Sequence, residues 1–109
     1  MTAHQELAAG RWWSLSLSEQ LGNVGSEVSR AIKWTGRNPA LAEGALFRAL
    51  ELFDLTLGDP RHRPHEARLR EIARAREVVV DLLAGPNEFQ TDGASLQKYF
   101  DAFALAARR

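Results

Sequence analysis

Apolar residues recur at intervals of three and four positions through two long segments, and this spacing restricts the fold more than any other feature of the sequence. In residues 17–34 and again in residues 39–57 the successive intervals are 4, 3, 4 and 4. Such intervals place side chains along one face of an α-helix, so each segment is predicted to be one amphipathic helix. The residues are Leu17, Leu21, Val24, Val28 and Ile32 in the first segment and Ala42, Leu46, Ala49, Phe53 and Leu57 in the second.

Residues typical of helix ends delimit these two segments. Ser16 and Glu19 have the spacing of a capping box before the first helix, and Gly36 follows its end. Asn38-Pro39 predicts a cap and a first-turn proline for the second helix, and the sequence Gly-Asp-Pro at 58–60 predicts its end.

Two more helices are predicted in the second half of the chain. One begins near Pro64 and ends at Gly85-Pro86, and the other follows Asp92, a residue type favoured at helix caps. Their apolar positions are Leu69, Ile72, Val79, Val80 and Leu83, and then Leu96, Tyr99, Phe100, Phe103 and Ala107. Short connections between four helices predict an all-α, single-domain, antiparallel four-helix bundle over residues 16–109, preceded by an N-terminal arm of residues 1–15.

Composition removes several classes of function. The chain of 109 residues has no net charge, so no overall field attracts it to nucleic acid or to acidic lipid. It has no cysteine, which excludes disulfides, thiol catalysis and cysteine-ligated metal sites. No apolar run approaches the length of about 18 residues that a membrane span needs, and the first residues lack a signal-peptide pattern. A cytoplasmic protein with no membrane partner is expected.

The predicted helix 39–57 is apolar on two sides. With Phe53 taken as the direction of the core, Phe47 and Leu55 point roughly 120° and 160° away, at about 100° per residue. Either this helix is central to the bundle, or its second face meets another protomer, or these side chains are simply exposed. A homo-oligomer, with a dimer as the first expectation, would cover such a face.

Two tryptophans and two glycines leave alternatives open. Trp12 and Trp13 precede a helix cap and are predicted to form a lid over one end of the bundle, or else to contact a partner protein. Gly22 and Gly25 lie inside the first predicted helix, where each costs up to about 1 kcal/mol relative to alanine. They are either tolerated surface residues or points where a neighbouring backbone, from this chain or a second copy, approaches closely.

Six arginines lie between positions 61 and 76, opposed there only by Glu66 and Glu71. One interpretation is a solvated helix face that pairs with itself, since Glu66–Arg70 and Arg68–Glu71 have helical pair spacing. The alternative is a basic face that contacts the phosphates of a nucleic acid. The residues predicted for those contacts are Arg63, Arg68, Arg70 and Arg74.

Arg76 stands apart from the other arginines because it falls within the apolar stripe of its helix. A guanidinium in that position needs a carboxylate or several carbonyls, since an unpaired buried charge is very costly, unless its stem packs while its head reaches water. A buried ion pair with Glu27, Asp54 or Asp101 is predicted, and a role in a binding site is the alternative.

Catalytic and metal-binding patterns are weak. Glu51-x-x-Asp54 resembles half of the magnesium motif of all-α nucleotide pyrophosphohydrolases of the MazG group, but Glu77 and Asp81 are four residues apart, not three, and supply no second half. The pair His62 and His65 has two-ligand spacing but few carboxylates nearby, and both are predicted to be surface residues. No catalytic residue, metal ligand or cofactor is predicted.

Four stretches of the chain resemble a small prokaryotic family of all-helical proteins of similar length. They are WWSLSLSEQLGNVGSEVSRAIKW, RALELFDLTLGD, REVVVDLLAG and LQKYFDAFALAARR. The resemblance runs from Arg11 to the end and implies one intact helical domain, but it implies no activity or ligand.

The predicted function is therefore a non-enzymatic helical interaction or adaptor module that self-associates and binds another protein. Trp12, Trp13, Phe47 and Leu55 are the predicted contact residues. The alternatives are a nucleic-acid-binding accessory protein, which would use the basic face, and a magnesium-dependent nucleotide phosphohydrolase.

Overall fold

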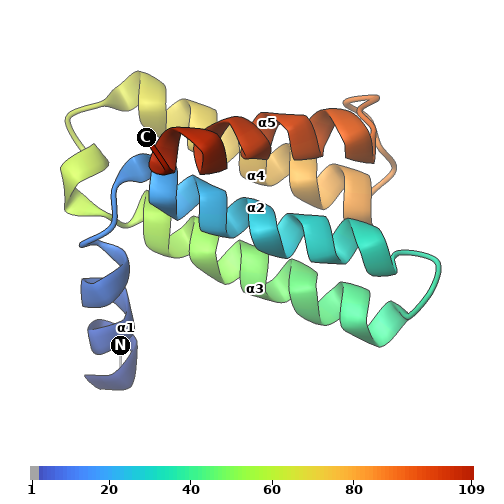
Figure 1. The fold of residues 1–109 in the computed structure, drawn as a ribbon, viewed down its shortest axis with the longest axis horizontal. Coiled ribbons are helices and arrows are strands. Elements are labelled where there is room, and N and C mark those ends of the chain that lie inside the picture. The colour runs from blue at the N-terminus through green and yellow to red at the C-terminus, as the bar shows by residue number, and fades with distance from the viewer. Residues whose placement is uncertain (1–2) are drawn as a thin grey trace.

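The computed structural model describes the backbone of residues 3–109 and the side chains of residues 8–109. In this part of the chain there are five α-helices, one short 3-10 helix and no strand (Figure 1). The elements are α1 (Ala3–Trp12), α2 (Leu17–Trp34), α3 (Pro39–Leu57), the 3-10 helix η1 (Pro60–His62), α4 (Glu66–Ala84) and α5 (Gly93–Ala107). Successive helices from α2 to α5 run in opposite directions, so the predicted all-α antiparallel bundle is confirmed.

The predicted helix caps are confirmed. The Ser16 hydroxyl accepts a hydrogen bond from the Glu19 N–H at 3.1 Å, and the Glu19 carboxylate accepts one from the Ser16 N–H at 3.0 Å. Asn38 caps α3 through the Leu41 N–H at 3.2 Å, and Asp92 caps α5. These bonds satisfy N–H groups that the first helical turn leaves without partners.

Two boundaries differ from the prediction. The third predicted helix begins at Glu66 and not near Pro64, because the side chain of Asp59 accepts the Arg61 N–H at 2.9 Å and closes the separate turn η1 before α4. The segment 1–15, described above as an arm, contains the ten-residue helix α1. α1 contacts α3 near the C-terminal end of α3 (Figure 1).

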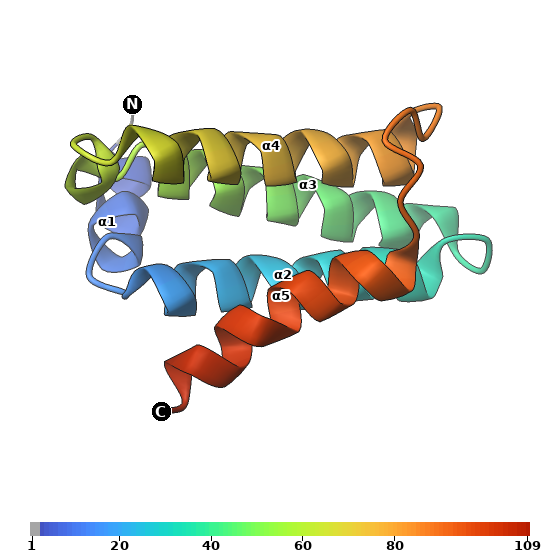
Figure 2. The same cartoon turned by 90° about the horizontal axis from the view of Figure 1, so that it is seen from above.

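The helices are not packed equally around the bundle. α2 packs along both α3 and α5, whereas α4 packs mainly against α3. Viewed from above, α5 lies beside α2 and runs progressively away from α4 towards its C-terminus (Figure 2). The side of the bundle between α4 and α5 is therefore the least closed.

The core and the residues packed against it contain most of the predicted apolar positions. The core also contains Ala31, Ala45 and Ala75, which were not predicted, whereas Leu69 and Val80 are outside it. Phe53 of α3 is fully buried and meets Phe100 of α5 edge to face, with ring centroids 6.1 Å apart. The buried cluster consists of Leu21, Val24, Val28, Ala31, Ala45, Leu46, Ala49, Phe53, Ile72, Ala75, Val79, Leu96 and Phe100. Leu17, Ile32, Leu57, Leu83, Tyr99 and Phe103 pack against it while partly exposed.

Close approach by α5 accounts for the two glycines of α2. A Cβ atom at Gly25 would lie 2.5 Å from Cβ of Phe100, and one at Gly22 would lie 3.2 Å from Cα of Ala104. Ordinary carbon–carbon contacts are about 3.5–4.0 Å. The neighbour is a helix of the same chain, and the missing side chains let α5 cross α2 at short range.

Among the described helices, none is both long enough and apolar enough to cross a membrane.

Candidate functional site

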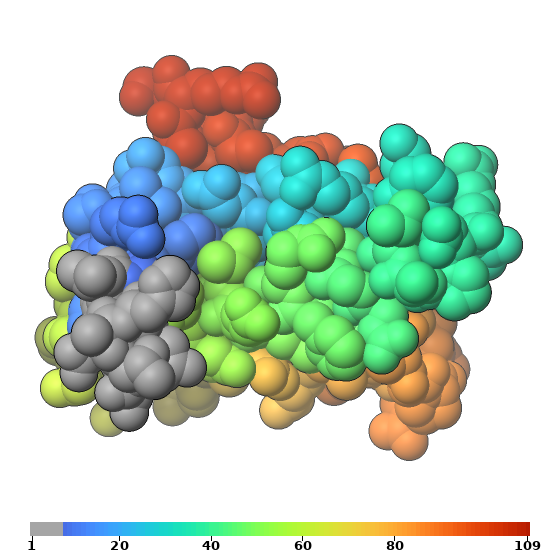
Figure 3. Space-filling view, turned by 90° about the horizontal axis from the view of Figure 1, so that it is seen from below, coloured from blue at the N-terminus to red at the C-terminus, as the bar shows by residue number. Residues whose placement is uncertain are grey.

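The outer face of α3 carries the most exposed large apolar side chain among the described residues. Phe47 is 54% exposed and Leu41 is 46% exposed, and each lies about 120° around the helix from the buried Phe53. Phe47 borders a hollow together with Leu83 and Ala84 of α4. Leu55 is half-buried. The atoms of α3 form a band across the middle of the face seen from below (Figure 3), and α1 contacts the C-terminal end of this helix. We call Leu41, Gly44 and Phe47 the α3 face.

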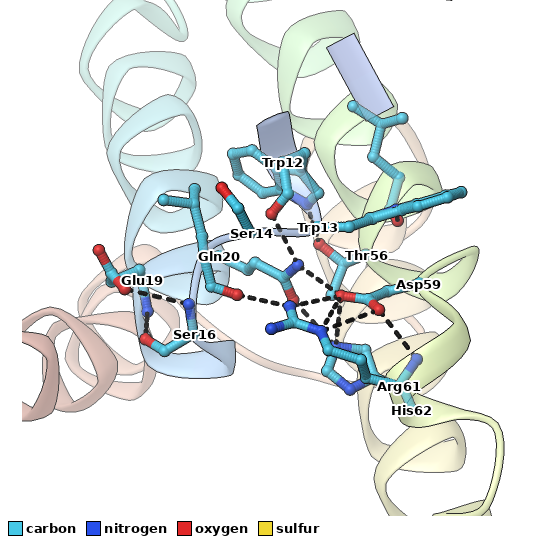
Figure 4. A network of polar contacts seen from close by, with 12 residues as sticks. Trp12, Trp13, Ser14, Ser16, Glu19, Gln20, Thr56, Asp59, Arg61 and His62 are labelled. Atoms are coloured by element: carbon cyan, nitrogen blue, oxygen red, sulfur yellow. Dashed lines mark hydrogen bonds and ion pairs between the residues drawn. The ribbon is translucent and has the colours of Figure 1, made fainter. Parts of the chain in front are cut away.

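Trp12 and Trp13 are both bonded to the C-terminal end of α3. The indole N–H of Trp12 donates to the Thr56 hydroxyl at 2.9 Å, and that of Trp13 donates to the Leu55 carbonyl at 2.7 Å (Figure 4). Both side chains are half-buried. They hold the end of α1 against the bundle, so their indole N–H groups are not free for a partner protein.

A buried polar network lies beneath these tryptophans. Gln20, Asp59 and His62 are at most 2% exposed and meet where α2 begins and α3 ends (Figure 4). The Gln20 amide donates to Asp59 Oδ2 at 2.9 Å and to the Trp12 carbonyl at 3.1 Å. Arg61 closes the network from outside, with Nη2 2.6 Å from Asp59 Oδ2. The prediction that His62 is a surface residue is therefore wrong.

The hydrogen bonds of this network determine which ring nitrogen of His62 carries the proton. Because the Gln20 nitrogen donates to two acceptors, Gln20 Oε1 must accept from His62 Nε2, at 2.9 Å. His62 Nδ1 then faces Arg68 Nη1 at 3.4 Å and carries no proton. Burial lowers the pKa of His62, and the positive charge of Arg68 lowers it further against the opposing effect of Asp59.

Asp59 is ionised within this network. Burial raises the pKa of Asp59, but the donors of Arg61 and Gln20 together outweigh that effect and hold the pKa well below its usual range. Among the described side chains, no buried polar atom lacks a hydrogen-bond partner. The network has its full set of partners within the chain, and its role is to hold the start of α2 against the α3–η1 corner.

Sequence reasoning missed this network, although one signal was present. Gln20 lies three residues after Leu17 and four before Val24, so it interrupts the apolar stripe of α2. A polar side chain in that position needs a buried partner, because a buried polar group without a hydrogen bond is costly.

The arginines between positions 61 and 76 differ in whether another side chain engages them. Arg61 pairs with Asp59, and Arg68 lies half-buried beside His62. The predicted pairs Glu66–Arg70 and Arg68–Glu71 are absent from the described side chains. Glu71 instead accepts the Tyr99 hydroxyl at 3.0 Å. Arg63, Arg70 and Arg74 are exposed and make no ion pair with any described side chain. Of the four predicted phosphate contacts, only Arg68 is therefore held by a hydrogen bond to another described side chain.

Arg76 bonds Asp54, one of its three predicted partners, but the pair is not buried. Arg76 Nε lies 2.9 Å from Asp54 Oδ1, and the two side chains are 33% and 62% exposed. Glu27 instead pairs with Arg30 and Arg48. The predicted pair with Asp54 is present, but the expectation that it would be buried was wrong.

Carboxylates do not gather into a metal centre in the described part of the chain. Glu51 is exposed, and Asp54 is occupied by Arg76. Asp81 is buried and accepts the N–H groups of Glu88 and Phe89, which fastens the loop before α5. No three His, Asp or Glu side chains described here are close enough to hold a metal ion.

A groove of about 280 Å³ opens between α4 and α5. Its walls are largely apolar, with Ala75 and Val78 on α4 and Leu96 on α5. Tyr99 lies on the α5 wall, and Arg74 and Glu71 lie on the α4 wall. Sequence reasoning missed this groove, because the pattern of apolar residues does not reveal that α5 packs on α2 and leaves α4 uncovered.

No protein-family model matches this chain, and neither a curated protein nor a solved structure matches it. Its function must therefore be inferred from the burial, contacts and charges of its own residues.

Proposed function

We propose that this protein is a non-enzymatic helical interaction module that self-associates through the α3 face. The observation that carries the proposal is the exposure of Phe47 and Leu41 on the side of α3 that faces away from the core. Burying a fully exposed side chain of this size is favourable by about 1.5–3 kcal/mol, and because these two are already about half covered, a second protein could gain about half of that for each.

Gly44 supports the same proposal. A glycine inside a helix costs about 1 kcal/mol relative to alanine. At Gly25 the close approach of Phe100 leaves no room for a side chain, which explains the glycine there. A Cβ at Gly44 would meet only the flexible end of Arg48, at 3.5 Å. Nothing described in the chain needs Gly44 to be a glycine, whereas a second helix approaching from outside would need it.

The arrangement that fits these residues is an isologous dimer with two antiparallel α3 helices. A two-fold axis beside Ala45 and Leu46 would set Phe47 of each copy into the space above Gly44 of the other. Such self-complementary contacts are the commonest way in which soluble proteins form dimers. The composite surface could then receive another protein, which is the adaptor role.

Sedimentation velocity over a wide range of protein concentrations tests the proposal. The wild-type protein is expected to be a dimer, and Phe47→Glu is expected to be a monomer with unchanged helix content. Gly44→Leu is expected to be a monomer too, because the new side chain fills the space for Phe47 while improving the helix itself. Leu105→Glu is the control, since Leu105 is 52% exposed but lies on α5. A wild-type monomer at all concentrations, or a dimer that survives both α3 variants, refutes the proposal.

A further inference from the structure

The groove between α4 and α5 has an aromatic wall whose orientation is already set. The Tyr99 hydroxyl donates to Glu71 Oε1 at 3.0 Å, across the groove from α5 to α4. Its ring meets Phe100 and Phe103 edge to face, with centroids 5.1 and 5.3 Å away. A ligand that stacks on this ring would not have to restrict the side chain first, which removes part of the usual cost of binding.

The opposite rim of the groove is positively charged. Arg74 lines the groove, and its guanidinium lies over the Phe89 ring at 5.1 Å. Arg70 is exposed one turn earlier on α4, about 6 Å along the helix axis at 1.5 Å per residue. Arg74 lines the groove together with Glu71, whereas Arg70 lies outside its lining, one turn before Arg74. We call Arg70 and Arg74 the basic edge.

No ion pair neutralises the two arginines of this edge. Neither Arg70 nor Arg74 has an ion-pair partner among the described side chains. Glu71 accepts the Tyr99 hydroxyl through Oε1 and keeps its negative charge and its second oxygen. The two exposed arginines therefore outnumber the one carboxylate that lines the groove beside them.

These features together match one kind of ligand. A nucleobase is flat and apolar on its faces, and its edge carries both donors and acceptors. In the groove, the face of the base could stack on the Tyr99 ring. The edge of the base could accept a hydrogen bond from Arg74 and donate one to Glu71. The phosphates on either side of that base would lie at the basic edge. A duplex keeps its bases stacked and paired, so only an unpaired base can enter.

We propose that the α4–α5 groove binds a single-stranded nucleic acid, with one unpaired base against Tyr99 and its flanking phosphates at Arg70 and Arg74. The proposal rests on charge complementarity and on the aromatic wall, and it is independent of self-association through the α3 face. Arg61, Arg68 and Arg76 are engaged within the chain and have no part in this site.

Fluorescence anisotropy with a labelled single-stranded RNA of roughly 12 nucleotides tests the proposal, a length within known single-strand site sizes. Tyr99→Leu is expected to weaken binding about 5- to 150-fold, since stacking of one base on an aromatic ring contributes about 1–3 kcal/mol. Tyr99→Phe keeps the ring and is expected to bind within about twofold of wild type. It also separates loss of stacking from loss of fold, because it removes only the hydroxyl bond to Glu71.

Salt dependence tests the two arginines. Arg70→Gln combined with Arg74→Gln is expected to reduce the slope of log affinity against log salt by about 1.4, at about 0.7 for each phosphate contact on a single strand. Lys33→Gln combined with Arg37→Gln removes equal charge at the α2–α3 turn and is expected to leave the slope unchanged.

Several results would overturn the proposal. The first is that the single strand does not bind at low salt, and the second is that a duplex of the same sequence binds equally well. The third is that mononucleotides alone occupy the site as tightly as the strand does. The fourth is that Tyr99→Leu binds the strand with unchanged affinity. An equal loss of slope in the Lys33 and Arg37 control would show non-specific charge attraction and would also overturn it. Because the Phe47→Glu monomer retains the groove, it is expected to bind the strand whether or not the dimer exists.

Discussion

Replacing Gly25 with alanine is expected to destabilise the protein, even though alanine is the better helix former. The new Cβ would lie 2.5 Å from Cβ and 3.0 Å from Cγ of Phe100. Normal contact is about 3.5–4.0 Å, so the two helices would have to separate by roughly 1 Å. Phe100 cannot retreat, because it is 2% exposed and its ring meets Phe53 on the far side.

Two opposing free energies set the size of this effect. Overpacking a core position typically costs about 1–3 kcal/mol, while replacing a mid-helix glycine with alanine stabilises the helix by up to about 1 kcal/mol. We expect Gly25→Ala to lower the free energy of unfolding by about 1–2 kcal/mol. Gly44→Ala, where the new Cβ meets only the end of Arg48 at 3.5 Å, is expected to raise it by about 0.5–1 kcal/mol.

Urea unfolding followed by circular dichroism measures both changes. The measurements belong in the Phe47→Glu background, so that self-association does not contribute to the free energy of unfolding. The two glycines lie in helix interiors and receive the same substitution, which makes Gly44→Ala a matched control. If Gly25→Ala were as stable as Gly44→Ala, the close crossing of α2 and α5 at Phe100 would be wrong.

Two further predictions concern the buried network. Asp59→Asn is expected to lower the free energy of unfolding by about 3 kcal/mol, because it removes the charge that Arg61 and Gln20 surround. Asp54→Asn breaks only the surface pair with Arg76 and is expected to lower the free energy of unfolding by less than about 1 kcal/mol. Equal losses in urea unfolding would contradict the difference in burial between the two pairs. Burial lowers the pKa of His62 from its ordinary value of 6.5. As the pH falls below 6.5, the unfolded chain therefore takes up a proton at this residue that the folded chain does not. Because the unfolded state is stabilised in this way, the free energy of unfolding is expected to fall between about pH 7 and pH 5. His62→Gln, whose side-chain nitrogen can donate to Gln20 in place of Nε2, is expected to remove this contribution, and the exposed His65→Gln is expected to keep it. A pH dependence identical in all three proteins would show that His62 does not contribute.

The helices and their caps could be predicted because they depend on residues close together in the chain. The Ser16–Glu19 capping box and the Asn38-Pro39 start involve side chains that bond to backbone within three residues. The apolar stripes of α2 and α3 repeat within one or two turns. Phe53 could be placed in the core and Phe47 away from it for the same reason.

The buried network could not be predicted, because its members are distant in sequence. Gln20 and His62 are separated by 42 positions, and Gln20 and Asp59 by 39. Only the reversal of the chain between α2 and α3 brings them together. Read locally, His62 sits in a stretch rich in arginine and proline and resembles a solvent-exposed loop residue.

The sequence by itself determined that this protein is a set of amphipathic helices, where those helices begin, and that one of them carries apolar residues on two sides. The tertiary structure decided which helices touch. Gly22 and Gly25 let α5 pack closely along α2, and this leaves the α4 wall with Arg74 open opposite Tyr99. The physical reason is that helix periodicity is a local property, whereas the choice of neighbour depends on how side chains from distant segments fit together.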